Sequence, residues 1–194
     1  NTAVNDFLVG YIDGVNYVDP SIEVLYSYVG DWTNSAKATE LANAQYDMGA
    51  DVIFAVAGGA GFGACESAAA TGHYAFGVDT DFAGQLEQSG SATADYVVSS
   101  AIKQFGKVVY DAMVKFYNGE LEFGKHTSCD VSSGYLEMLE TKQFEKIVKE
   151  GMPDVYKRYT EICQDLKDGK IEVGTAVGAT PEYVAQKKAE AAAH

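Results

Sequence analysis

The chain has 194 residues, of which 47% are hydrophobic, and it carries a formal net charge of −14 at pH 7. This length and hydrophobic content suffice for one domain with a buried core. The strong negative charge argues against nucleic acid and anionic membrane surfaces as partners. Three scattered cysteines without a C-x-x-C spacing argue against a structural zinc site.

The first fifty residues alternate helical and strand patterns. Apolar residues recur at helical spacing over residues 1–18, which predicts an amphipathic helix. β-Branched and aromatic residues predict a strand over residues 22–28. A second helix is expected over residues 35–48, with Asn34 as its N-cap.

A glycine cluster between two buried strands forms the centre of the predicted fold. Residues 51–57 and 74–78 are short apolar runs typical of strands, and they flank a helix of small residues over 64–71. Glycines after the first strand let backbone approach a ligand closely and leave free N–H groups for it; they occupy positions 58, 59, 61 and 63. Ligands of open parallel sheets bind outside the C-terminal ends of the strands, so we expect this loop and Asp79, which follows the second strand, to share one site.

The rest of the chain predicts one more strand–helix unit and then mostly helices. Residues 83–94 are small and polar, which predicts a loop over the ligand side. Further expected elements are a strand over 96–99, a helix over 101–117, an extended segment, expected as a strand, over 121–131, a turn at 132–134, helices over 142–149 and 153–168, and a helical or disordered tail over 180–194.

This order of elements predicts an α/β fold with a doubly wound, mostly parallel sheet flanked by helices. We expect an α/β ligand-binding lobe over residues 1–131, a C-terminal return with helices over 132–173, and a tail over 174–194. The first helix has no strand before it, which is the pattern of a chain that starts within a domain.

Two functions fit a glycine loop followed by an acid. Residues 59–64 match G-x-G-x-x-G/A, and Asp79 stands about 20 residues on, which fits an NAD(P)-binding or sugar-metabolising α/β enzyme. The alternative is a lobe that binds a sugar or nucleoside through its ribose hydroxyls. The second is favoured, because a complete helix–strand–helix precedes the loop, whereas the dinucleotide motif normally opens the first βαβ unit.

Several segments together resemble the basic membrane protein family, the PnrA-like purine-nucleoside-binding lipoproteins of ABC transporters. The resemblance spans about residues 4–118 and rests on the following stretches: DFLVGYIDGV and DP at 6–15 and 19–20, YVGDWTN at 28–34, AQYDMGADVIF at 44–54, GGAG at 58–61, GVDTD at 77–81 and SSAIK at 99–103. It implies the second lobe of a type I periplasmic-binding-protein-like clamshell, without the first lobe.

The resemblance also implies roles for particular residues. Trp32 takes the place of a Phe that stacks on the base, and Gly58 and Gly59 let the backbone approach the ribose. Asp79 accepts from both ribose hydroxyls, with Asp81 as the alternative acid. These roles suit the chemistry, since an aromatic face stacks on any base and an ionised carboxylate offers paired acceptors.

Two further residues have a ligand role and a structural one. Lys103, expected at the start of a helix, would donate to the ribose and neutralise Asp79, or would simply be an exposed helix residue. Asn34 either contacts the ligand or caps its helix, and the cap is favoured.

The function implied by the resemblance is capture of a purine nucleoside for uptake, without catalysis and without a cofactor. The partners implied are the nucleoside, a membrane permease, and either the missing N-terminal lobe or a second copy of the chain. The full-length protein would be extracytoplasmic, attached to the cell membrane as a lipoprotein. A regulatory ligand sensor of the same family is the other alternative.

Overall fold

Four strands form one sheet, in the order β1-β2-β3-β4, in the computed structural model, which describes residues 1–127 and 129–192. The strands β1 (Val52–Phe54), β2 (Tyr74–Asp79) and β3 (Val97–Lys103) are parallel, and β4 (Leu136–Met138) runs antiparallel to β3. The helices are α1 (Thr2–Val18), α2 (Ser35–Asp47), α3 (Gly61–Thr71), α4 (Phe82–Gln88), α5 (Phe105–Tyr117), α6 (Lys142–Phe144), α7 (Pro153–Lys167) and α8 (Pro181–Ala192). The predicted α/β class with a mostly parallel sheet is confirmed.

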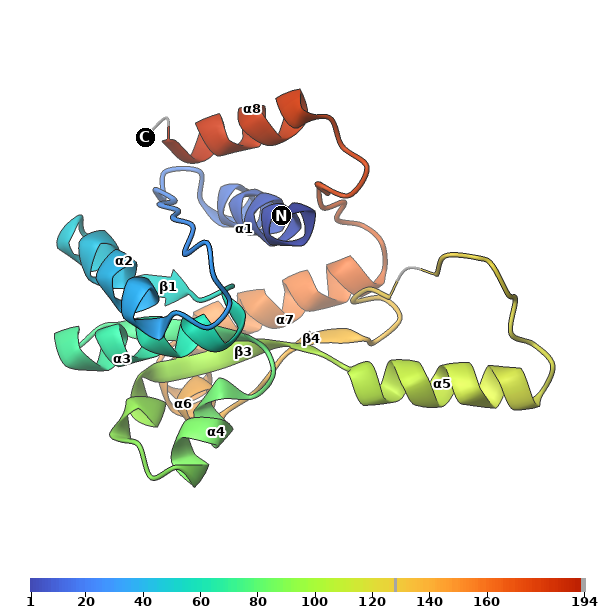
Figure 1. Cartoon of the computed structure of the whole chain (residues 1–194), viewed down its shortest axis with the longest axis horizontal. Helices are drawn as coiled ribbons and strands as arrows, with labels where there is room; N and C mark the ends of the chain where they lie inside the picture. The colour runs from blue at the N-terminus through green and yellow to red at the C-terminus, as the bar shows by residue number, and fades with distance from the viewer. Residues whose placement is uncertain (128, 193–194) are drawn as a thin grey trace.

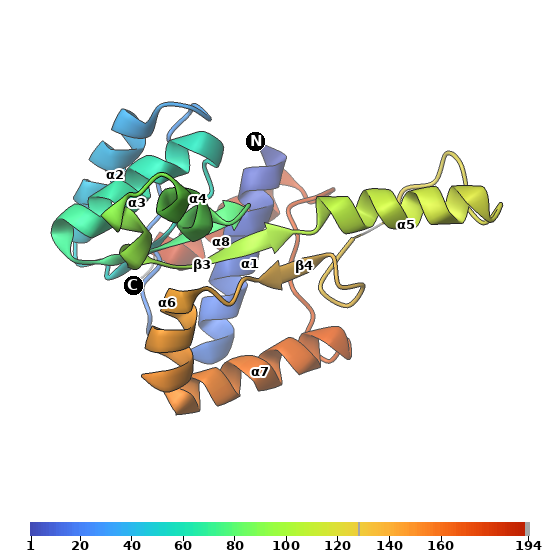
Figure 2. The same cartoon turned by 90° about the horizontal axis from the view of Figure 1, so that it is seen from below.

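Helices surround the sheet. Figure 2 shows α2, α3 and α4 on the side of β2, α6 and α7 on the side of β4, and α1 passing behind β3. Two 3₁₀ turns (Gly58–Ala60 and Ala92–Tyr96) and a π-helical turn (Glu145–Glu150) complete the regular structure. In Figure 1, α8 lies above α1 at the top of the view, and α5 projects away from the body to the right.

The core lies between α2, α3 and the sheet, and small residues allow these elements to approach closely. Cys65 and Ala68 of α3 are fully buried against Ala75 of β2 and Val97 of β3. Gly63 lies against the backbone of α2, where an added Cβ would overlap the carbonyl of Ser35. The run of glycine and alanine therefore serves helix packing as well as the loop.

The predicted strand over residues 22–28 is wrong. Residues 23–29 have no regular structure and pair with no strand that the structure describes. Side chains hold the segment instead: the Tyr28 hydroxyl donates to Asn5 of α1 at 2.7 Å, and the Gln45 amide of α2 donates to Ser27 at 3.1 Å. A strand pattern needs a neighbouring strand to become a ladder, and this segment has none beside it.

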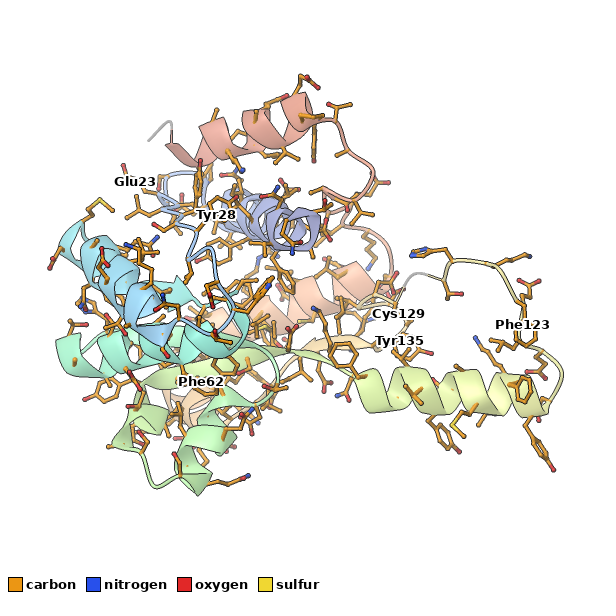
Figure 3. All side chains as sticks on the ribbon, viewed as in Figure 1. Glu23, Tyr28, Phe62, Phe123, Cys129 and Tyr135 are labelled. Carbon is orange, nitrogen blue, oxygen red and sulfur yellow. The ribbon has the colours of Figure 1, made fainter. Side chains whose placement is uncertain are left out.

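One predicted loop and one predicted strand also differ from the structure. The expected loop over 83–94 contains α4 and a 3₁₀ turn, because the Asp81 carboxylate caps α4 through the amide of Gly84 at 2.8 Å. The expected strand over 121–131 is not regular in its described part, and the chain instead forms β4 after the turn near Gly134. Figure 3 shows Phe123 within that irregular stretch, beyond the end of α5.

The boundary between β3 and α5 also differs from the prediction. β3 runs to Lys103 because its last residues pair with β2 on one side and β4 on the other. The helix expected from residue 101 begins at Phe105. Lys103 thus stands at the end of a strand, and its side chain is directed by the sheet.

The C-terminal tail is helical and is fastened to α1. Oδ1 of Asp6 accepts from the Thr175 hydroxyl at 2.6 Å and the Ala176 amide at 2.8 Å, and Oδ2 of Asp13 accepts from the Gly174 amide at 2.8 Å. Lys187 of α8 forms an ion pair with Asp13 at 2.8 Å. No helix in the described part of the chain is long and apolar enough to cross a membrane.

Candidate functional site

Trp32 and the glycine turn form one part of the predicted site. The Trp32 carbonyl accepts a hydrogen bond from the Ala60 amide at 2.8 Å, which fixes the loop against the 3₁₀ turn. Gly58 has a φ of 55°, and a Cβ on it would lie 3.3 Å from the Trp32 ring. A side chain there would crowd the indole, so glycine is required both by the backbone and by the neighbour. Trp32 itself stays 51% exposed.

The loop that carries Trp32 is shaped by Asp31. Its Oδ1 accepts from the backbone amides of Thr33 and Asn34 and from the Thr33 hydroxyl. These hydrogen bonds, the one from the Thr33 amide foremost, hold the pKa of the Asp31 carboxyl below its ordinary value. The ionised carboxylate therefore fixes the turn that follows Trp32.

Asp79 and Lys103 form the second part of the site. Asp79 is the last residue of β2, Lys103 is the last residue of β3, and their side chains form an ion pair with Nζ and Oδ1 2.7 Å apart. Asp79 has a φ of 65°, and it is the one non-glycine residue with a positive φ in the described chain. Such strain is concentrated at functional sites, where the surrounding structure holds it.

Phe7 of α1 is a residue of this site that sequence reasoning missed. The Lys103 ammonium lies 4.8 Å from the centre of the Phe7 ring, close enough for a cation–π contact. The Phe7 ring also packs edge-on against Phe54 of β1. Its position in the helical apolar pattern signalled only a core residue, and nothing in the sequence pairs it with Lys103.

Asp81 and Asn34 have structural partners. Asp81 accepts from the Gly84 amide as the N-cap of α4, and Asn34 accepts from the Lys37 amide at 3.0 Å as the N-cap of α2. Of the two carboxylates after β2, Asp79 is thus the one whose side chain is not engaged in a helix cap.

The remaining glycines of the loop, and the thiol next to them, have packing explanations. A Cβ on Gly61 would lie 2.9 Å from the Ala55 carbonyl, and Gly63 abuts α2. Cys65 is fully buried, and burial raises the pKa of its thiol to about 12, so it is protonated at neutral pH. These observations favour helix packing over a dinucleotide loop and do not support a nucleophilic role for Cys65.

The seven predicted residues follow the C-terminal ends of neighbouring elements. Trp32, Gly58 and Gly59 are together after residues 23–29 and β1, and Asp79 and Lys103 are together at the ends of β2 and β3. Asn34 and Asp81 cap the helices that leave the same regions. The arrangement offers an exposed aromatic face, a glycine backbone that a ligand can approach closely, and an ion-paired carboxylate. These groups suit the binding of a small polar ligand.

Comparison with known proteins identifies the family of this chain. The family model of the "ABC transporter substrate-binding protein PnrA-like" matches residues 2–172. The chain is 30% identical over 173 residues to basic membrane protein D of Borreliella burgdorferi, covering 88% of this chain and 48% of the relative. It is 28% identical over 180 residues to the ABC transporter nucleoside-binding protein BmpA of Lactococcus lactis, covering 88% of this chain and 49% of the relative.

A solved structure supports the fold. An ABC transporter solute-binding protein from Aeropyrum pernix K1 superimposes with a TM-score of 0.72 at 20% identity, covering 95% of this chain and 58% of that one. The chain thus spans about half the length of the curated relatives it matches. With the family model matching most of its residues, the chain belongs to the PnrA-like family of ABC transporter substrate-binding proteins.

Proposed function

We propose that this chain forms one half of a purine-nucleoside site in a substrate-binding protein, which captures the nucleoside outside the cytoplasm and hands it to a membrane permease. Family membership supports the transport role, and the name of the Lactococcus lactis relative supports the ligand class. In the whole protein the lobe would be held at the cell membrane by a lipid anchor. The function is binding, with no chemical step.

The observation that carries the proposal is the ion pair between Asp79 and Lys103. One carboxylate oxygen of Asp79 is enclosed and takes the ammonium, while the side chain as a whole remains 40% exposed. The other carboxylate oxygen, Oδ2, has two lone pairs and can accept from two neighbouring hydroxyls, and a ribose presents such a pair. Lys103 holds the acceptor in place and offers its remaining N–H groups to the same sugar.

Trp32 supplies the surface for the base. A purine stacked on an aromatic ring gains about 1–3 kcal/mol without regard to its identity. Gly58 keeps the space beside the indole free of a side chain, since a Cβ there would lie 3.3 Å from the ring. Gly59 borders the Trp32 carbonyl, which would lie 3.4 Å from a Cβ on it. The base would be covered on one face by this chain, and the rest of the whole protein would cover the other.

A titration followed by NMR tests this proposal. Trp32 is the only tryptophan, so its indole N–H signal reports on stacking without ambiguity. We expect inosine and guanosine to shift this signal, with a Kd on the order of 1 mM because one face of the base stays in water. Free ribose should shift the amide of Asp79 but not the indole.

Matched variants separate the two carboxylates. Asp79→Asn should weaken inosine binding at least about tenfold, since the paired acceptor is lost. Asp81→Asn should leave binding unchanged, because Asn is an equally good N-cap. Loss of binding in Asp81→Asn alone would reject the assignment of Asp79, and binding of NADH without binding of nucleosides would reject the proposed function.

A further inference from the structure

A buried serine of β3 holds the start of α4. The side chain of Ser100 is fully buried, and its Oγ accepts a hydrogen bond from the amide of Phe82 at 3.3 Å. Phe82 is the first residue of α4. Because the first amides of a helix have no acceptor within the helix, they need one from elsewhere. β3 therefore supplies, through Ser100, the acceptor for the first amide of α4.

The groups around this hydrogen bond are closely packed. Ser100 pairs with Gly77 of β2 in the sheet. A Cβ on Gly77 would lie 2.5 Å from the Ser100 Oγ and 2.6 Å from the Phe82 ring, so the hydroxyl and the ring together fill the space beside Gly77. The Phe82 ring is buried and stacks on that of Phe62 of α3, which Figure 3 labels, with ring centroids 4.2 Å apart. The start of α4 is thus fixed relative to β2, β3 and α3.

Asp79 begins the short segment that leads from β2 to this fixed point. Its φ of 65° turns the chain out of the strand. The ladder between β2 and β3 extends to Asp79 itself, which pairs with Ile102. Two residues later the chain reaches the amide of Phe82, which Ser100 holds. A left-handed backbone at a non-glycine residue persists where the surrounding structure holds it, and here β3 holds it from both ends.

We propose that Ser100 is a positioning residue for Asp79: by holding the Phe82 amide, it keeps the Asp79 carboxylate in place for the ligand. The inference rests on the proposed function, in which this carboxylate binds the ribose hydroxyls. Lys103 fixes the carboxylate directly through its ammonium, and Ser100 fixes the backbone that carries it. A group that is held in place before binding loses less conformational entropy when the ligand arrives, so affinity depends on both contacts.

Ser99 offers a matched control. It precedes Ser100 on β3 and is equally buried, and its hydroxyl donates to the Leu139 carbonyl at 2.6 Å. Leu139 follows β4, so this hydrogen bond lies on the side of β3 away from β2 and Asp79. Replacing either serine by alanine removes one buried hydroxyl and one hydrogen bond from the same strand. The two variants should therefore lose similar stability and differ in their effect on Asp79.

Nitrogen-15 relaxation and inosine titration of Ser99→Ala and Ser100→Ala test the inference. Without ligand, the order parameter of the Asp79 amide should fall in Ser100→Ala from about 0.85, the value of a rigid backbone, toward about 0.6, and stay unchanged in Ser99→Ala. The Kd for inosine should rise at least about threefold in Ser100→Ala and less than about 1.5-fold in Ser99→Ala. The urea midpoint should fall by a similar amount in both variants.

A second change removes the same hydrogen bond from its donor. An ester in place of the peptide bond between Asp81 and Phe82, introduced with the hydroxy-acid analogue of phenylalanine, keeps every side chain and removes the Phe82 N–H. This chain should show the same mobile Asp79 amide and the same weaker binding as Ser100→Ala. It also decides the question if Ser100→Ala does not fold.

Three results would overturn the inference. One is an Asp79 amide that stays as rigid in Ser100→Ala and in the ester as in the wild type. A second is equal loosening of Asp79 by Ser99→Ala, which would mean that β3 as a whole had loosened. A third is a wild-type chain that binds inosine and a Ser100→Ala chain that binds it equally tightly. If the wild type binds no inosine, the proposed function fails, and the relaxation measured without ligand still decides whether Ser100 positions Asp79.

Discussion

The ammonium of Lys103 lies 2.7 Å from Oδ1 of Asp79, and this ion pair joins the last residues of two neighbouring parallel strands. Asp79 adopts a left-handed backbone conformation in this position, with a φ of 65°. The pair holds a carboxylate at the C-terminal edge of the sheet, where ligands of such folds bind.

Two substitutions of Asp79 should separate the effect of its positive φ on stability from the effect of its charge. Asp79→Asn should change the free energy of unfolding by less than about 1 kcal/mol, because Asn tolerates positive φ. Asp79→Val should lower it by about 2 kcal/mol or more, since a β-branched residue is strained there. Urea denaturation measures both, and equal stability of the two variants would contradict the left-handed backbone.

Substitution of Gly63 should test how closely α3 approaches α2. A Cβ at Gly63 would overlap the Ser35 carbonyl and lie 2.8 Å from the Thr39 hydroxyl, so Gly63→Ala should destabilise the fold by about 1–3 kcal/mol. Gly14→Ala is the control, since Gly14 lies within α1 with nothing within 4 Å of its Cβ position, and it should stabilise by about 0.5–1 kcal/mol. Thermal or urea unfolding that ranks the two variants in the other order would refute this packing.

Lys187 should fasten α8 to α1. It pairs with Asp13 and Glu190, and these hydrogen bonds, the one with Asp13 foremost, raise the pKa of the Lys187 ammonium. A raised pKa means that this stabilisation is complete below the ordinary lysine value, about 10.4, and is lost as pH rises through the higher one. Lys187→Met should therefore speed amide exchange in α8 at pH 7 severalfold, whereas Lys188→Met, which lacks these carboxylate partners, should not.

The turn that precedes β4 should loosen in acid. Hydrogen bonds from the Ser132 hydroxyl and from Ser133 lower the pKa of the Asp130 carboxyl to about 2. A depressed pKa means that the contribution of this carboxylate is present above its ordinary pKa and is lost as pH falls toward 2. The carboxyl carbon signal of Asp130 should titrate with a midpoint near 2 in NMR, and Ser133→Ala should move that midpoint upward.

The helix α5 should contribute little to global stability. None of its residues is buried, and Val109, Tyr110 and Met113 are each more than half exposed. Val109→Lys combined with Tyr110→Lys should change the free energy of unfolding by less than about 0.5 kcal/mol. The same double variant should reduce self-association, measured by light scattering, and a large loss of stability would show that α5 packs on the body in solution.

The sequence predicted the elements whose partners are adjacent in the chain. The helices α1, α2 and α7 and the strand β2 appear close to their expected bounds, because apolar periodicity and caps such as Asn34 act locally. The strand pattern over residues 22–28 failed for the opposite reason. A strand is completed by a neighbour, and no residue pattern within the segment shows whether the neighbour is there.

The same distinction explains the site. Asp79 lies at the end of a strand and the glycines form a turn after β1, as predicted, because the end of an apolar run and a cluster of glycines are both visible in the sequence. Lys103 was expected on a helix, and its true place at the end of β3 follows from pairing with β4, which is more than thirty residues away in the chain. Phe7 was missed because its contact with Lys103 joins distant segments.

The carboxylates of Asp6 and Asp13 tie the first helix to residues 174–176 and to α8, across sequence separations of about 160–175 residues. During synthesis α1 leaves the ribosome well before these partners. The side of α1 that carries Asp6 and Asp13 therefore stays uncovered until the partners have been made, at about 5–20 residues per second. Closure of this contact should be among the slowest steps of folding, and chains interrupted before residue 174 should be the ones that chaperones retain.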